Sequence, residues 1–197
     1  MTGVELADGA VNAVKFVNQD GREQRVLTDQ VISSAPLPEL VRWLVPSAPS
    51  RVLAAADGLR YRDMLVVCLV LDKADLFPDN WIYVHSPDVK VGRIQNFGNW
   101  SRAMVPVPGH SALGLEYFCH RGDDIWSQDD EQLARLARAE LVSLGLARGA
   151  TVVDSTIIRM PRAYPVYDES YRAHVDVIRE YLSGCSGLQT VGRNGLH

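Results

Sequence analysis

Met64-Leu-Val-Val-Cys-Leu-Val-Leu71 is the longest apolar run of the chain, and it predicts a β-strand within Tyr61–Lys73. The run shows no alternation of apolar and polar residues, so we expect both faces of this strand to be covered in the centre of a sheet. It is much shorter than the roughly 20 apolar residues that a membrane-spanning helix needs. The chain is therefore expected to build a sheet around this segment and to have no membrane span.

Short apolar segments bounded by turn residues predict further strands on both sides of this one. They lie at Val11–Phe16, Gln24–Ser33, Trp81–His85, Val91–Phe97, Ala112–Cys119, Thr151–Met160 and Leu188–Val191. The first two flank the turn signal Asn18-Gln-Asp-Gly21 and so predict a hairpin. The third and fourth are separated by Ser86-Pro-Asp88 and predict a meander. The sheet is expected to be mainly antiparallel.

Three segments predict helices. The first begins at Pro38, which suits a first turn, and ends at Pro46. The second begins near Ser127 and Asp130, a capping-box-like pair. The third spans Asp168–Leu182 and carries one apolar stripe. A mainly antiparallel, mixed sheet with interspersed helices packed on one face is an α+β fold.

Composition places the chain among globular proteins. Its 197 residues make about one domain or a large piece of a two-domain protein. The net charge is -4 and no basic block occurs, so no nucleic-acid partner is expected. Met1 is not followed by a basic and then an apolar segment, and the three cysteines lie far apart. We therefore expect a cytoplasmic protein with free thiols at Cys68, Cys119 and Cys185.

The common motifs of nucleotide, metal and hydrolase sites do not occur in the sequence. It contains no Gly-x-Gly-x-x-Gly, no Walker loop, no His-Glu-x-x-His and no Gly-x-Ser-x-Gly. Cys119-His120 lacks further ligands, so no metal is expected. The remaining candidates are clusters of aromatic, basic and glycine residues.

Three such clusters stand out. Asn96-Phe-Gly-Asn-Trp100 ends a strand and suits the wall of a ligand cleft, or else its indole closes the edge of the core. Arg159–Asp168 holds two arginines and two tyrosines in a proline-stiffened segment, which suits an anion or a planar ring, or is an ordinary connection. Gly192-Arg-Asn-Gly195 follows a short strand, where backbone can approach a phosphate or a flavin. Such a strand normally leads into a helix, so we expect a chain cut from a longer one.

Taken together, these segments resemble the flavin amine oxidase and protoporphyrinogen oxidase superfamily, in the branch related to UDP-galactopyranose mutase. The matching segments are Val31–Pro38, Trp81–Ser101, Leu115–Cys119, Met160–Tyr167 and Leu188–His197. The last resembles the start of the family's second flavin motif, whereas the N-terminal Gly-x-Gly-x-x-Gly that seats the ADP part of FAD is absent. The resemblance implies that residues 1–197 form a single region like the substrate-binding domain. Strands within 1–36 and 186–197 would join a missing FAD domain.

The resemblance also implies roles for individual residues. Those expected near FAD in the parent protein are Val4, Pro36, Gly192 and Arg193. Those expected to face a small-molecule substrate are Trp100, Arg159 and Tyr164. It implies no catalytic residue, because in this superfamily the flavin carries out the redox chemistry and the protein positions it.

Three functions are consistent with the sequence. The first is a fragment of an FAD-dependent oxidoreductase, amine oxidase-like or mutase-like, which is inactive alone and binds FAD weakly or not at all. The second is a cofactor-free α+β module that binds a small ligand. The third is a scaffold domain that forms homo-oligomers through exposed strands.

Overall fold

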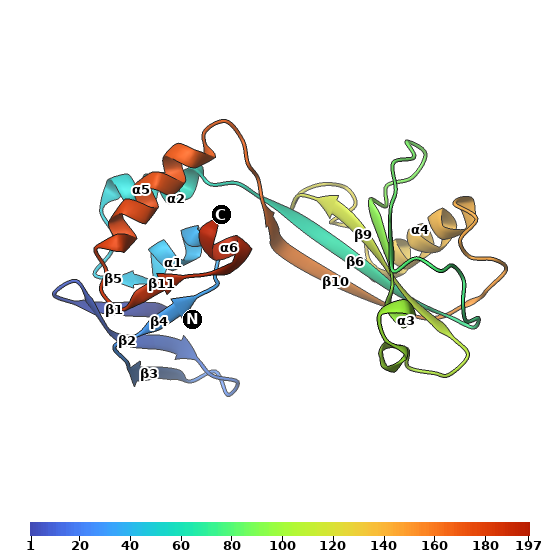
Figure 1. Cartoon of the computed structure of the whole chain (residues 1–197), viewed down its shortest axis with the longest axis horizontal. Helices are drawn as coiled ribbons and strands as arrows, with labels where there is room; N and C mark the ends of the chain where they lie inside the picture. The colour runs from blue at the N-terminus through green and yellow to red at the C-terminus, as the bar shows by residue number, and fades with distance from the viewer. The chain divides into compact units, whose positions relative to one another are not determined.

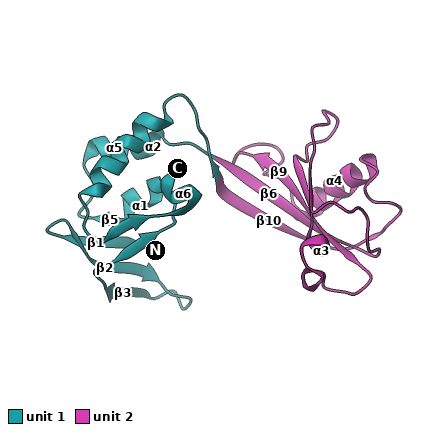
Figure 2. Ribbon diagram, viewed as in Figure 1, with its two compact units in different colours: residues 1–61, 164–197 teal, residues 62–163 magenta.

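A computed structural model describes the whole chain, residues 1–197, as two compact units. Unit 1 comprises Met1–Tyr61 and Tyr164–His197, and unit 2 comprises Arg62–Ala163 (Figure 2). The first elements (Figure 1) are β1 (Gly3–Ala7), β2 (Ala10–Val17), β3 (Glu23–Leu27), β4 (Val31–Ser33), α1 (Leu37–Trp43), β5 (Leu44–Val45) and α2 (Ser50–Gly58). They are followed by β6 (Tyr61–Leu71), β7 (Trp81–Tyr83), β8 (Arg93–Asn96), α3 (Phe97–Trp100), η1 (Arg102–Met104), β9 (Ser111–Cys119), α4 (Asp130–Ser143), β10 (Val152–Pro165), α5 (Tyr171–Ser183), β11 (Leu188–Thr190) and α6 (Gly192–Leu196).

Unit 2 is built on a five-stranded sheet in the order β10-β6-β9-β8-β7. β6 lies inside this sheet and pairs with β9 along its length, which confirms the predicted central strand. Its alternate side chains Leu65, Val67 and Leu69 are fully buried. They share a core with three residues of α4, namely Leu133, Ala137 and Leu141. The predicted α+β fold, with a mainly antiparallel sheet and a helix packed on one face, is confirmed.

Helix α4 begins after Asp129, so the capping pair predicted at Ser127 and Asp130 is wrong. The Asp129 carboxylate accepts a hydrogen bond from the Gln132 backbone N–H at 2.7 Å. In return, the Gln132 side chain accepts one from the Asp129 N–H at 3.0 Å, which completes a capping box. Ser127 instead donates its hydroxyl to the Asp123 carbonyl in the preceding turn.

A buried carboxylate joins α4 to the sheet of unit 2. Glu140, 6% exposed, accepts hydrogen bonds from the backbone N–H groups of Lys90 at 2.6 Å and Val91 at 3.1 Å. It also accepts one from the Tyr117 hydroxyl at 3.0 Å. Burial and the Glu140 charge raise the pKa of Tyr117, so this hydroxyl stays a donor. Glu140 therefore holds the segment before β8 against the helix.

A second buried carboxylate joins the two ends of unit 2. Asp63, 7% exposed, accepts a hydrogen bond from the Arg162 backbone N–H at 2.7 Å. It accepts another from the Arg121 N–H at 2.8 Å. Arg162 has a φ of +54°, a conformation that costs an L residue energy unless its surroundings hold it. The Asp63 contact provides that support where β6 begins and β10 leaves the unit.

Unit 1 contains a sheet in the order β3-β2-β1-β5 and a parallel pair, β11-β4. The predicted hairpin is present as β2 and β3. The continuous strand predicted over Gln24–Ser33 is wrong, because Thr28 donates its hydroxyl to the Gln30 carbonyl and the chain turns there. β4 then pairs in parallel with β11 instead of extending the hairpin.

The helices of unit 1 cover a core of their own. α1 and α5 lie where the sequence predicts helices, whereas α2 is not among the predicted elements. The buried residues of α2 are Val52, Ala55 and Ala56, and those of α5 are Val175, Ile178 and Leu182. All six belong to one apolar cluster. Gly192–Gly195, predicted as a turn at the end of a strand, lies in the short helix α6 (Gly192–Leu196).

The helices of this chain are all short. The longest, α4, has 14 residues, and α5 has 13. None has the length and apolar character that crossing a membrane requires.

All three cysteines are free thiols, and we expect each to react slowly with iodoacetamide. Burial raises the pKa of Cys68, Cys119 and Cys185, so less of each is the reactive thiolate at a given pH. In the native protein near pH 8, each thiol should be labelled at least about tenfold more slowly than the thiol of glutathione, as measured by mass spectrometry. In denaturant this difference should vanish. Native labelling at the rate of glutathione would contradict this expectation.

Candidate functional site

The parallel strands of unit 1 bring the segments that follow them to one edge. β4 and β11 run in the same direction, with Leu188 opposite Val31 and Thr190 opposite Ser33. Beyond their carboxyl ends, β4 leads through Pro36 into α1, and β11 leads into α6 (Figure 1). In open α/β sheets, ligands bind beyond the carboxyl ends of parallel strands, so the corresponding end of this two-stranded pair is a candidate site.

Glycines let the end of β11 lie close to the end of β4. Gly192 begins α6 with a φ of +73°, which favours glycine. A Cβ at Gly195 would lie 2.9 Å from the Ser33 carbonyl oxygen, so a larger residue would push α6 away from β4. The Val191 N–H donates to the same Ser33 carbonyl at 2.9 Å. Two predicted cofactor residues, Pro36 and Gly192, thus follow neighbouring strand ends.

A pocket of about 290 Å3 lies beside the end of β4. Its lining residues are Met1, Val4, Val31, Ile32, Ser33, Ser34, Ala35, Leu40 and Trp43. Val4, predicted to lie near a cofactor, is fully buried in β1. Ile32 is 69% exposed, so β4 offers apolar surface as well as this pocket. The pocket connects Val4 to the segment that leads to Pro36.

Arg193 and Tyr164, predicted for different ligands, lie against one another. The guanidinium carbon of Arg193 is 4.2 Å from the centre of the Tyr164 ring, which is a close cation–π contact. Arg193 lies in α6 and Tyr164 near the end of β10, so the contact joins segments far apart in sequence. The flat ring orients the flat guanidinium.

Unit 1 also contains a cluster of tyrosine rings around His197, which the sequence patterns did not predict. The His197 ring centre lies 5.1 Å from that of Tyr61, 5.8 Å from Tyr167 and 5.9 Å from Tyr171. His197 Nδ1 is 3.2 Å from the Tyr61 hydroxyl. Burial raises the pKa of Tyr61 to about 12 and lowers the pKa of His197, so both side chains are neutral near pH 7.

Unit 2 carries a second candidate site, made of exposed rings. Trp81 and Tyr83 in β7 and Trp100 in α3 are 47%, 55% and 49% exposed. The Trp81 ring centre is 5.7 Å from that of Trp100 and 6.2 Å from that of Tyr83. We call these three residues, together with Arg93 and Phe118, the aromatic platform.

Arg93 is the cation at the centre of the aromatic platform. Its guanidinium carbon lies 5.7 Å from the ring centre of Trp81, 5.8 Å from Tyr83 and 5.9 Å from Phe118. Strand register explains this position. Arg93 of β8 lies opposite Tyr83 on one side and opposite Glu116 of β9 on the other.

The charge of Arg93 is balanced by a buried carboxylate. Arg93 Nε and Nη2 lie 2.7 and 2.5 Å from Glu116 Oε2. The Gln95 amide donates to the other oxygen, Glu116 Oε1. The side chain of Glu116 is 2% exposed and that of Arg93 is 15% exposed. The Arg93–Glu116 ion pair is therefore shielded from water and held by hydrogen bonds, so the two side chains interact strongly.

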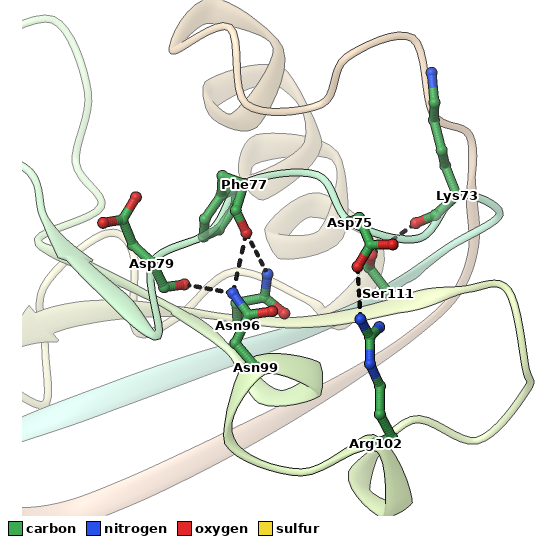
Figure 3. A network of polar contacts seen from close by, with 8 residues as sticks. All are labelled: Lys73, Asp75, Phe77, Asp79, Asn96, Asn99, Arg102 and Ser111. Atoms are coloured by element: carbon green, nitrogen blue, oxygen red, sulfur yellow. Dashed lines mark hydrogen bonds and ion pairs between the residues drawn. The ribbon is translucent and has the colours of Figure 1, made fainter.

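Asparagines of the predicted Asn96–Trp100 segment bind the loop that leads into β7 (Figure 3). The side-chain amides of Asn96 and Asn99 donate to the Phe77 carbonyl at 3.3 and 3.0 Å. The Asn99 amide also donates to the Asp79 carbonyl at 2.9 Å. Since this loop runs directly into Trp81, the two asparagines connect the backbones that carry Trp81 and Trp100.

The same loop is held at its other end. Arg102 Nη2 pairs with Asp75 at 2.6 Å, and Ser111 donates its hydroxyl to the Lys73 carbonyl at 2.6 Å (Figure 3). The Arg102 pair is exposed and adds little by itself. Together with the asparagine contacts, these bonds give the loop before Trp81 a defined course.

Glycines seat two rings on the sheet, that of Phe118 in the aromatic platform and that of Phe97 outside it. A Cβ at Gly114 would lie 2.8 Å from Cζ of Phe97. A Cβ at Gly92 would lie 2.9 Å from Cδ2 of Phe118. These rings therefore pack directly on backbone, which only glycine allows.

Arg159 does not contact these rings through its guanidinium, which binds residues at the beginning of α4 instead. Its Nη1 is 2.7 Å from Asp130 Oδ1, and its Nη2 is 2.7 Å from the Gln128 carbonyl. Arg159 thus holds the beginning of α4 against β10. Its contact with a substrate stays a prediction, as do the ligand contacts of Trp100 and Tyr164. No group of three or more His, Cys, Asp and Glu side chains is close enough to bind a metal ion.

Comparison with known proteins relates this fold to three solved structures. A scan of protein-family models finds no match, and neither does a search of curated proteins. A reduced UDP-galactopyranose mutase has a TM-score of 0.77 at 18% identity over 98% of this chain and 40% of its own. A proposed protoporphyrinogen oxidase from Exiguobacterium sp. 255-15 scores 0.66 at 18% identity, over 99% and 42%. An oxidoreductase from Methanosarcina mazei scores 0.64 at 13% identity, over 98% and 43%.

These comparisons establish the fold of the chain. They cover nearly all of it and show that it shares the fold of these three proteins. The chain spans only 40 to 43% of the length of the three proteins. The substrates and cofactors of the larger proteins are therefore matters for proposal in this chain.

Proposed function

We propose that this chain is part of an FAD-dependent oxidoreductase or mutase-like flavoenzyme, in which it positions a small-molecule substrate over the flavin. The observation that supports this most is the fold likeness, which covers 98% of the chain and includes a UDP-galactopyranose mutase. The chain spans 40% of that mutase, which suits a piece of a larger enzyme. In this proposal, strands within 1–36 and 186–197 belong to the FAD domain.

The edge formed by β4 and β11 suits one wall of a dinucleotide site. Its pocket of about 290 Å3 offers apolar surface for a flat ring beside Val4. At Gly192 the nearest atom to a Cβ would be Ser34 Cβ at 4.0 Å, so a ligand can approach the backbone. Arg193 adds a cation suited to a pyrophosphate or to the flavin. The residues present therefore fit part of FAD, without the glycine-rich loop and helix that anchor its phosphates.

Each predicted residue has a role in this proposal. FAD, when bound, supplies the chemistry, which is hydride transfer in an oxidoreductase or assistance to a sugar rearrangement in a mutase-like enzyme. Val4 and Pro36 contribute backbone contacts to the cofactor, and Gly192 admits it. Tyr164 stacks on Arg193 and so orients the guanidinium that faces the cofactor. The residues on the substrate side are Trp100, Arg159 and Tyr164.

The chain by itself is expected to bind FAD weakly, because the unit that anchors the phosphates is missing. Titration with FAD, followed by flavin fluorescence, should show no saturation below about 100 μM, or roughly -5.5 kcal/mol. A dissociation constant near 1 μM, about -8 kcal/mol, would mean a complete site within these residues and would contradict the proposal.

A chimera tests whether the chain takes part in a flavin site. The chain replaces the matching segment of UDP-galactopyranose mutase, and the purified chimera should be yellow. Arg193→Ala should lower its flavin content, whereas Arg135→Ala, the same change at a 66% exposed side chain of α4, should not. A folded but colourless chimera, or equal flavin in both variants, would favour a cofactor-free binding module.

A further inference from the structure

We propose that the aromatic platform of unit 2 binds a neutral, planar, conjugated ring, and that Glu116 sets this preference by balancing the charge of Arg93. The inference deepens the proposed function, since it rests on Trp100 of unit 2 facing the substrate. It names the class of substrate, which that proposal leaves open.

The aromatic platform has the character of a binding surface rather than of a core edge. Trp81, Tyr83 and Trp100 each keep about half of their surface exposed. Exposed rings that lie against one another, as these do, form the kind of contiguous apolar patch that marks a ligand or partner surface. The backbones on either side of the rings are nevertheless held by hydrogen bonds to the Phe77 carbonyl, a buried one from Asn96 and a partly buried one from Asn99. Exposed rings on a well-anchored backbone suit ligand stacking, because little ordering is left to the binding step.

Charge excludes an anion as the preferred ligand. An anionic group would be drawn to Arg93, but Glu116 already takes Nε and Nη2 at 2.7 and 2.5 Å. Glu116 is itself only 2% exposed in its side chain, so an incoming anion would meet a fixed buried carboxylate. The two charges cancel, and the aromatic platform presents no net charge to a ligand.

A cation is disfavoured as well. The ring faces that would attract one already lie within 6 Å of the guanidinium carbon of Arg93, at Trp81, Tyr83 and Phe118. A second cation on the same rings would be close to the first. A neutral ligand avoids both penalties.

The polar groups at the centre favour a conjugated ring over a hydroxyl-rich one. Glu116 Oε2 binds Arg93 and Glu116 Oε1 binds the Gln95 amide, so both carboxylate oxygens are engaged. A polyhydroxylated ring would bury hydroxyls against partners that already bind one another. A flat conjugated ring gains the stacking of Trp81 and Trp100 without needing those partners.

Two probes that differ by one charge test the proposal in the chain as it is. Coumarin is a neutral planar ring, and coumarin-3-carboxylate is the same ring with a negative charge. Ligand-observed NMR titration should give at least about tenfold tighter binding of coumarin. Methyl β-D-galactopyranoside should bind more weakly than coumarin. A wild-type preference for the carboxylate or for the galactoside would overturn the proposal.

Variants connect the binding to the named residues. Trp81→Ala should weaken coumarin binding about tenfold, and this ring is half exposed, so the fold is kept. Glu116→Gln should raise the affinity for the carboxylate probe about tenfold, because Arg93 loses its counter-charge. Glu131→Gln, on an 88% exposed side chain, is the matched control and should change neither affinity.

These outcomes separate this inference from the proposed function. The probe titrations contain no flavin. Preferential binding of coumarin would therefore support the aromatic platform as a binding site even if the chimera is colourless. Unchanged probe binding in Trp81→Ala or in a folded Glu116→Gln would overturn the platform assignment even if the chimera is yellow. Should Glu116→Gln fail to fold, the two probes with the wild type and Trp81→Ala still decide the question.

Discussion

Gly187→Ala is expected to destabilise the protein by about 3 to 5 kcal/mol. Gly187 has a φ of +79°, which an L side chain adopts only at a cost. A Cβ there would also lie 2.1 Å from the backbone oxygen of Asp29, which no rotamer change can move aside. The Gly187 carbonyl accepts the Val31 N–H at 2.8 Å, directly beside the β4–β11 pair. Urea denaturation followed by circular dichroism measures the loss.

Gly21→Ala is the matched control for this substitution. Gly21 has nearly the same φ, +76°, but a Cβ there would have nothing within 4 Å. Its loss is therefore expected to be about 1 kcal/mol, the conformational cost alone. Equal losses at the two positions would mean that the contact between Gly187 and Asp29 does not matter.

Glu140→Ala should cost about 3 to 5 kcal/mol in unit 2. The substitution removes the acceptor of three hydrogen bonds and leaves the Val91 N–H buried without it, and the Lys90 N–H partly buried. It also opens a cavity beneath α4, where Tyr117 is 1% exposed. The unfolding midpoint in urea should fall accordingly.

Two further variants separate the contributions to this loss of stability. Tyr117→Phe removes one donor and keeps the ring, so it should cost about 1 kcal/mol. Glu131→Ala removes an acid of the same helix that is 88% exposed, and it should change stability by less than about 0.5 kcal/mol. A loss from Glu140→Ala no larger than that from Glu131→Ala would show that the buried carboxylate does not hold the helix.

The parts of the fold that the sequence predicted well carry a strong local signal. β6 is apolar on both faces, and α4 carries an apolar stripe at helical spacing, so neighbouring residues suffice to identify them. The β4–β11 pair could not be predicted in this way. Only three residues of each strand pair, and most of the chain separates the two strands. α2 was missed because its buried face includes the small side chains Ala55 and Ala56.

The aromatic platform was only half predicted, for a related reason. Trp100 was noticed within a polar and aromatic cluster, but Trp81, Tyr83 and Arg93 belong to strands whose register no local pattern gives. One signal was available. Glu116 is a lone charge in the apolar segment Ala112–Cys119, and a buried charge requires a partner. The partner turned out to be Arg93, directly opposite on β8.

The hydrogen bond from the Arg162 N–H to Asp63 has a consequence for the order in which the protein assembles. It closes unit 2 into a loop of chain whose first and last residues meet, so this unit is complete once residue 163 has been synthesised. Unit 1 is interrupted by that loop. Strand β4 is made early, yet β11 emerges from the ribosome only after all of unit 2. During translation, the backbone edge of β4 stays unpaired until β11 emerges, and an unpaired strand edge is a template for pairing with another chain.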